Sequence, residues 1–152
     1  MKASKIRASV LIAYALLVCG CGFEAGYYGK DRAAAESAAG DFRALYNSGK
    51  YADMYQLGDG QLQQSISLEQ FITSVHSTFA SYGAYKKSNQ AAASCFPHQV
   101  RFVYLTEFEK RPATELMVWS VKHGKALLVN YQVSSGYVDV PDSAKEKCPA
   151  PN

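Results

Sequence analysis

The chain has 152 residues, of which 48% are hydrophobic and 19% are charged, so its composition suits one globular domain and excludes a disordered chain. Its formal net charge is +3, but three of its 16 basic residues, Lys2, Lys5 and Arg7, lie among the first 20 residues. Removing these three leaves 13 basic residues against 13 acidic ones. A neutral domain without a basic cluster gives no electrostatic reason to bind nucleic acid, and we exclude nucleic acid as an expected partner.

The N-terminal segment has the charge and hydropathy pattern of an export signal. Residues 1–7 include three basic residues and no acidic one, and residues 8–18 are all small or apolar apart from one tyrosine. At about 1.5 Å per residue this run is too short to cross a hydrocarbon core of roughly 30 Å. Its length instead fits the apolar part of a signal peptide, which predicts that residues 1–20 are removed after export.

The stretch Val18-Cys19-Gly20-Cys21 that ends this segment resembles the lipobox of bacterial lipoprotein signal peptides. The resemblance implies that Cys21 becomes the first mature residue and carries acyl chains, palmitate among them, that anchor the protein to the membrane. Cys19 fits poorly because the bulky Val18 precedes it. Gly22, not aspartate, follows Cys21, and this implies an outer-membrane lipoprotein that faces the periplasm. The alternative is ordinary secretory cleavage that leaves a soluble periplasmic protein.

Helical patterns follow this segment. Residues 21–30 lack periodicity and are interpreted as a tether, before a domain over residues 31–140. Asp31 is the predicted N-cap of a helix over residues 32–48, which Gly49 ends. Residues 51–57 predict a short second helix, ended by the glycines at 58 and 60. Ser67 and Gln70 form a capping box that predicts a further helix, which ends at Gly83.

Alternating apolar residues dominate the second half of the chain. Strands are predicted over residues 99–109, 114–122 and 126–134, with a weaker strand over 85–94. His123-Gly124 is the predicted turn of the last hairpin. Strict alternation places Tyr131 on the face opposite Leu128, and Glu115 is assigned to the solvated face. Residues 141–152 read as an irregular tail.

Helices followed by an antiparallel meander define an α+β fold in which helices pack on one face of a curved sheet. The order of elements is similar to the cone-shaped fold of the nuclear-transport-factor-2-like superfamily. The resemblance rests on residues 42–55, the helix over 67–83 and the hairpin over 115–133. It implies a small envelope domain, and homodimers formed through the sheet face. A cystatin-like sheet wrapped on one helix is the alternative.

Two cysteines, Cys95 and Cys148, remain beyond the signal segment. In an oxidising compartment, they predict one disulfide that holds the proline-rich tail against the sheet. Two free thiols with a redox or metal role are the alternative, but no Cys-x-x-Cys or neighbouring histidine supports it.

Tyrosine is the most unusual component of the domain, because many tyrosines fall where the helices should meet the sheet. Their rings either fill the core or line a ligand pocket together with a histidine on the third helix. The predicted pocket residues are Tyr46, Tyr55, His76, Tyr104 and Tyr131.

The sequence contains no nucleophile motif and no metal-ligand spacing, so no catalytic residue, metal or cofactor is assigned. His98 and His123 are interpreted as loop and turn residues. We expect a non-enzymatic binding domain whose partner is another envelope protein or a small apolar ligand. The alternative is a small periplasmic hydrolase or isomerase that uses His76 or Asp53 as an acid or base.

Overall fold

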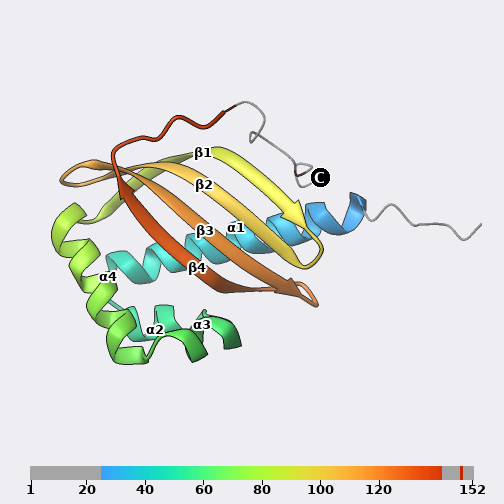
Figure 1. Ribbon diagram of the computed structural model, residues 1–152, viewed down its shortest axis with the longest axis horizontal. Coiled ribbons are helices and arrows are strands. Elements are labelled where there is room, and N and C mark those ends of the chain that lie inside the picture. The colour runs from blue at the N-terminus through green and yellow to red at the C-terminus, as the bar shows by residue number, and fades with distance from the viewer. Residues whose placement is uncertain (1–24, 142–147, 149–152) are drawn as a thin grey trace, which may run out of the picture.

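The computed structural model describes residues 25–141 and residue 148. The predicted signal peptide over residues 1–20, the proposed acylation site at Cys21 and most of the tail over 141–152 lie outside the described residues. Eight elements follow one another: α1 (Ala25–Asn47), α2 (Tyr51–Gln56), α3 (Gly60–Ser65), α4 (Leu68–Tyr82), β1 (Tyr85–Phe96), β2 (Gln99–Phe108), β3 (Pro112–Lys122) and β4 (Lys125–Ser135). The strands form an open antiparallel sheet in the order β1-β2-β3-β4 (Figure 1). The predicted α+β class, with helices before an antiparallel meander, is therefore confirmed.

Helix α1 crosses one face of the sheet and contacts all four strands (Figure 1). Its predicted apolar face is buried, because Ala35, Ala39, Phe42 and Tyr46 are each at most 1% exposed. The alanines let the helix backbone approach the sheet closely, while the Phe42 ring packs on β3 and β4 and the Tyr46 ring packs on β2. As predicted, α1 ends before Gly49, whose φ of +68° is readily adopted only by glycine.

The N-terminal part of α1 corrects the sequence interpretation. The helix begins at Ala25, so residues 25–30 are helical rather than part of a tether, and Asp31 lies within the helix instead of capping it. Gly26 and Gly29 argued against a helix here, but intrinsic propensity is a weak preference that packing overrides. One such tertiary contact is the hydrogen bond of 3.1 Å that Arg32 Nη1 donates to the carbonyl oxygen of Cys148.

The turn predicted between the second and third helices contains an additional helix, α3. Asp59 is its N-cap and accepts a hydrogen bond of 2.9 Å from the Leu62 N–H. Just before α3, the backbone of Leu57 and Asp59 pairs with Leu128 of β4 in a short parallel bridge around Gly58. The short helix α2 and the capping box of Ser67 and Gln70 at the start of α4 are confirmed.

Two tight turns join the strand pairs. His98 closes the β1–β2 hairpin with a φ of 58°, and His123 (φ 52°) and Gly124 (φ 76°) form the predicted β3–β4 turn. Two consecutive positive φ angles match the twist of a two-residue hairpin. In β2 the predicted alternation is confirmed, since Val100, Phe102, Tyr104, Thr106 and Phe108 are all buried.

A bulge in β4 corrects the predicted alternation of that strand. Trp119 pairs with Leu128 and Val118 pairs with Asn130, so Val129 is an extra residue without a partner on β3. The side-chain parity changes at this residue, and both Leu128 and Tyr131 join the core. A strict period of two could not anticipate this change, because one inserted residue moves every later side chain to the other face.

Glu115 is the second correction on the sheet. It lies on the face of β3 that also presents Met117 and Trp119 to α1, and it is only 1% exposed. The prediction that it is solvated was therefore wrong. Carboxylates are buried in this way only when other groups satisfy their charge and lone pairs.

Candidate functional site

A polar network surrounds the buried carboxylate of Glu115. Its Oε1 accepts a hydrogen bond of 3.0 Å from the Tyr131 hydroxyl, and its Oε2 accepts one of 3.1 Å from Arg43 Nη2. The Thr106 hydroxyl also donates to Oε2. Arg43 and Glu115 form an ion pair whose side chains are 13% and 1% exposed. The network thus connects α1 to β2, β3 and β4 across the interior of the domain.

Aromatic rings enclose the cation of this pair. The Arg43 guanidinium lies 4.1 Å from the ring centroid of Tyr104 and 4.7 Å from that of Tyr85. Burial raises the pKa of the Tyr104 phenol well above its ordinary value. Burial, and then the Glu115 charge, raise the pKa of the Tyr131 phenol in the same direction. Both phenols keep their protons at neutral pH, and the Glu115 carboxylate has two hydroxyl donors and one cation as partners.

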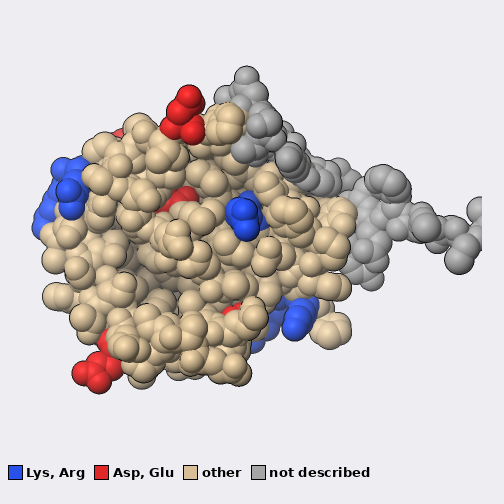
Figure 2. Space-filling model, viewed as in Figure 1, with Lys and Arg blue, Asp and Glu red and all other residues tan. Residues whose placement is uncertain are grey.

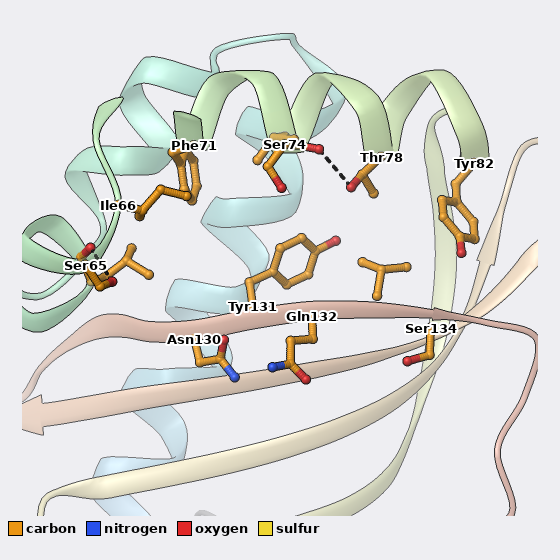
Figure 3. Close-up of a pocket in the computed structure, with 13 residues that line it drawn as sticks. Ser65, Ile66, Phe71, Ser74, Thr78, Tyr82, Asn130, Tyr131, Gln132 and Ser134 are labelled. Atoms are coloured by element: carbon orange, nitrogen blue, oxygen red, sulfur yellow. Dashed lines mark hydrogen bonds between the residues drawn. The ribbon is translucent and has the colours of Figure 1, made fainter. Parts of the chain in front are cut away.

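A groove of about 560 Å³ lies between α4 and β4 (Figure 3). It is bordered by uncharged residues from α3 and its C-cap, from α4 and from β4: Leu62, Ser65, Ile66, Phe71, Ser74, Val75, Thr78, Tyr82, Asn130, Tyr131, Gln132, Val133 and Ser134. Figure 2 shows this side of the molecule hollowed between regions that are mostly uncharged. The space between α4 and β4 is left open because α4 packs mainly on α2 rather than on β4.

The side chains of β4 alternate along the groove. Tyr131 points toward α4, whose Ser74 and Thr78 lie opposite it, while Gln132 and Ser134 point to the other side of the strand (Figure 3). All five residues from 130 to 134 nevertheless border the groove. Because alternate side chains face away from it, the main chain of β4 forms much of that wall.

The structure separates the five predicted pocket residues. Tyr131 borders the groove, whereas Tyr46 is buried in the core and donates its hydroxyl to the Gly83 carbonyl over 3.0 Å. The Tyr55 hydroxyl lies 2.9 Å from the carbonyl oxygen of Ile66 and holds the end of α3. Tyr104 is buried beneath Arg43. His76 is exposed, with its ring centroid 6.3 Å from that of Tyr51.

The other candidate chemical groups are not gathered into one centre. Asp53 is exposed on α2, and His98 and His123 border a separate depression of about 430 Å³ at the hairpin turns. Among the described residues, no three histidine, cysteine, aspartate or glutamate side chains are placed to hold a metal ion.

The two cysteines of the domain lie at disulfide distance. Cys95 on β1 and Cys148 have Cα atoms 4.9 Å apart, within the usual range for a disulfide. The bridge connects the end of β1 to the chain near the C-terminus, next to the Arg32 contact described above.

Sequence reasoning missed most of the groove. Its hydroxyl-bearing residues, Ser74 and Thr78, are four residues apart on α4 and therefore share a face, a spacing that was visible in the sequence. The opposite wall was not visible, because it depends on the bulge in β4. None of the described helices is long and apolar enough to cross a membrane. Comparisons with protein-family models, with curated proteins and with solved structures each found no match to this chain.

Proposed function

We propose that the protein is a lipid-anchored lipoprotein of the bacterial envelope whose domain binds an uncharged, partly apolar ligand or partner segment in the groove between α4 and β4. The observation that carries the binding proposal is the groove itself, with about 560 Å³ of space and a wholly uncharged lining. Apolar side chains such as Phe71, Val75 and Val133 favour ligand surface that is removed from water. The Ser74 hydroxyl can donate a hydrogen bond that orients the ligand, whereas the Thr78 hydroxyl donates to the Ser74 carbonyl oxygen over 3.1 Å and can accept one.

A photocrosslinking experiment tests the binding site. Benzoylphenylalanine is placed at Ser74, which borders the groove, or at Ser77, which is exposed on the same helix outside the lining. After irradiation of living cells, we expect an adduct of defined added mass from position 74 and none from position 77. Equal labelling from both positions, or no adduct from position 74, contradicts the groove as the binding site.

The anchor rests on the lipobox resemblance of Val18-Cys19-Gly20-Cys21. Intact-mass measurement of the membrane fraction tests it with a matched pair of variants. We expect acyl mass on the wild-type chain and on Cys19→Ser, and loss of that mass together with release from the membrane in Cys21→Ser. An unmodified wild-type mass would support secretory cleavage to a soluble periplasmic protein instead.

The enzymatic alternative lacks a supporting observation. His76 and Asp53 are both exposed, so neither has the burial that would tune an acid or base. Glu115 is buried, but its oxygens are engaged by three donors. The binding function therefore remains the single candidate.

Membership of the nuclear-transport-factor-2-like superfamily, with its cone-shaped sheet, also stays a proposal. Its support is the order of the elements, with α1 across one face of an antiparallel meander. The homodimer that this resemblance implies is tested by sedimentation at several concentrations. A monomer at all concentrations counts against it.

A further inference from the structure

The groove exposes the main chain of an edge strand. β4 is the last strand of the sheet, so one side of its backbone has no neighbouring strand. Within the described residues, the only backbone partners on that open side are Leu57 and Asp59, which bond to Leu128 over 2.7 and 2.8 Å. This bridge shows that the edge accepts an extended segment as a neighbour. It ends where α3 begins, and residues 130–134 continue the edge into the groove.

The two edge strands of the sheet differ in how well they are protected from pairing with another chain. β1 carries exposed lysines at Lys86 and Lys87 and two register shifts, devices that discourage pairing with another chain. The groove stretch of β4, Asn-Tyr-Gln-Val-Ser over residues 130–134, contains no charged residue and no proline. Such a stretch is competent to pair with another strand.

We propose that the occupant of the groove is an extended peptide that adds to β4 as a fifth strand, an inference that rests on the proposed binding function. A partner opposite residues 130–134 would need about five residues, or roughly 16 Å of extended chain. Its alternate side chains face α4 and meet the apolar surface of Phe71, Val75 and Val133. The intervening side chains of the peptide lie beside Gln132 and Ser134 on the other face of the sheet, where polar residues are tolerated. The peptide recognised is therefore uncharged, with alternating apolar and polar residues.

The exposed backbone favours a peptide over a small apolar molecule. Water can hydrogen-bond the N–H and C=O groups on the open side of β4. An apolar ligand would displace that water without replacing its hydrogen bonds, and each group left unpaired would weaken its binding. An added strand replaces these hydrogen bonds in register. It can therefore use both the apolar side chains of the groove and the main chain of β4.

The test uses the processed protein, purified from cells in detergent, and a phage-displayed library of random seven-residue peptides. Selected peptides are synthesised, and their binding is compared for the wild type, for Ser74→Trp, which fills the groove, and for Ser77→Trp, which does not. We expect Ser74→Trp to weaken binding more than tenfold and Ser77→Trp to change it less than twofold. Thr78→Glu, which places a charge in the groove, is a second blocking variant should Ser74→Trp fail to fold.

N-methylation of the peptide backbone gives a readout specific to strand addition. Methylating an amide removes one donor, so we expect about tenfold weaker binding at every second residue and little change at the residues between. Equal sensitivity at adjacent residues, or no selected peptide that depends on the groove, overturns strand addition. A dimer lost in Ser74→Trp but kept in Ser77→Trp also overturns it, because a second copy would then fill the edge. If the crosslinker at position 74 captures a small molecule while no peptide binds, the proposed binding function stands and this inference alone fails.

Discussion

Glu115 and Arg43 form an ion pair inside a domain whose core is otherwise mainly apolar. Removing two charges from water costs several kcal/mol for each ion, so the pair gains little net stability over two well-packed apolar residues. The pair instead fixes the position of α1 relative to the sheet, since Arg43 must reach both the Glu115 carboxylate and the Tyr104 ring. Loss of one partner leaves the other charge buried without compensation, and this asymmetry gives a test.

We predict that Glu115→Gln lowers the free energy of unfolding by roughly 3–5 kcal/mol, because Arg43 then remains buried without a counter-charge. Urea unfolding followed by circular dichroism measures the change. The double variant Glu115→Gln with Arg43→Met should recover part of this loss. Lys87→Met, which breaks the solvent-exposed pair of Lys87 and Glu107, is the control and should leave the urea midpoint unchanged. A double variant less stable than Glu115→Gln alone would refute the coupling.

The buried phenols predict a loss of stability at alkaline pH. Burial is the first cause that raises the pKa of Tyr46, Tyr104 and Tyr131 above the ordinary 10.0, so the folded state keeps phenolic protons that the unfolded chain releases. Stability is unaffected by these groups below about pH 9 and falls as the pH rises through 10, by up to about 1.4 kcal/mol per pH unit for each tyrosine.

Urea midpoints measured across this pH range check the prediction, with phenolate absorbance as a second signal. Tyr104→Phe is the matched variant. It removes one of the three phenols and should make the alkaline loss of stability less steep than in the wild type. An identical slope in the two proteins would show that Tyr104 does not contribute.

At the scale of elements, features that depend on neighbouring residues could be predicted from the sequence, and features that depend on distant residues could not. The capping box of α4 and the His123-Gly124 turn each depend on a few consecutive residues, and both were predicted. The bulge at Val129 and the burial of Glu115 depend on partners far along the chain, as does the position of α3, since its N-cap Asp59 pairs with Leu128 of β4. The groove needs two of these at once, since α3 closes its end and the bulge turns Tyr131 toward α4. It could not have been inferred from periodicity alone.

Gly40 within α1 and Gly49 just beyond its end have opposite conformational requirements. Gly40 lies within the helix with open space around its Cα, whereas Gly49 follows the helix at a φ of +68°. We predict that Gly40→Ala stabilises the protein by about 0.5–1 kcal/mol and that Gly49→Ala destabilises it by about 1 kcal/mol. Thermal unfolding of the two variants beside the wild type measures both effects. Shifts of the same sign would contradict the assigned end of α1.

At the scale of the whole molecule, contacts with Cys148 connect the N-terminal part of α1 to the end of β1. Arg32 of α1 donates a hydrogen bond to the carbonyl oxygen of Cys148, and Cys148 lies at disulfide distance from Cys95 at the end of β1. α1 begins only a few residues after Cys21, so acylation there would hold this end of the domain close to the bilayer surface. The groove between α4 and β4 is formed by other elements, so an anchor at this end would leave it open.

The disulfide gives the last prediction. It closes a loop with a sequence separation of 53 residues. Restricting a loop of this length in the unfolded chain stabilises the native state by roughly 4 kcal/mol in the chain-entropy treatment. We therefore predict that reduction lowers the unfolding temperature of the wild type, and that a double variant, Cys95→Ala with Cys148→Ala, is equally destabilised and insensitive to reductant. Thermal unfolding with and without dithiothreitol makes the comparison, and free-thiol titration of the unfolded, unreduced wild type should find neither cysteine reactive. Two reactive thiols would instead favour the free pair that the sequence left open.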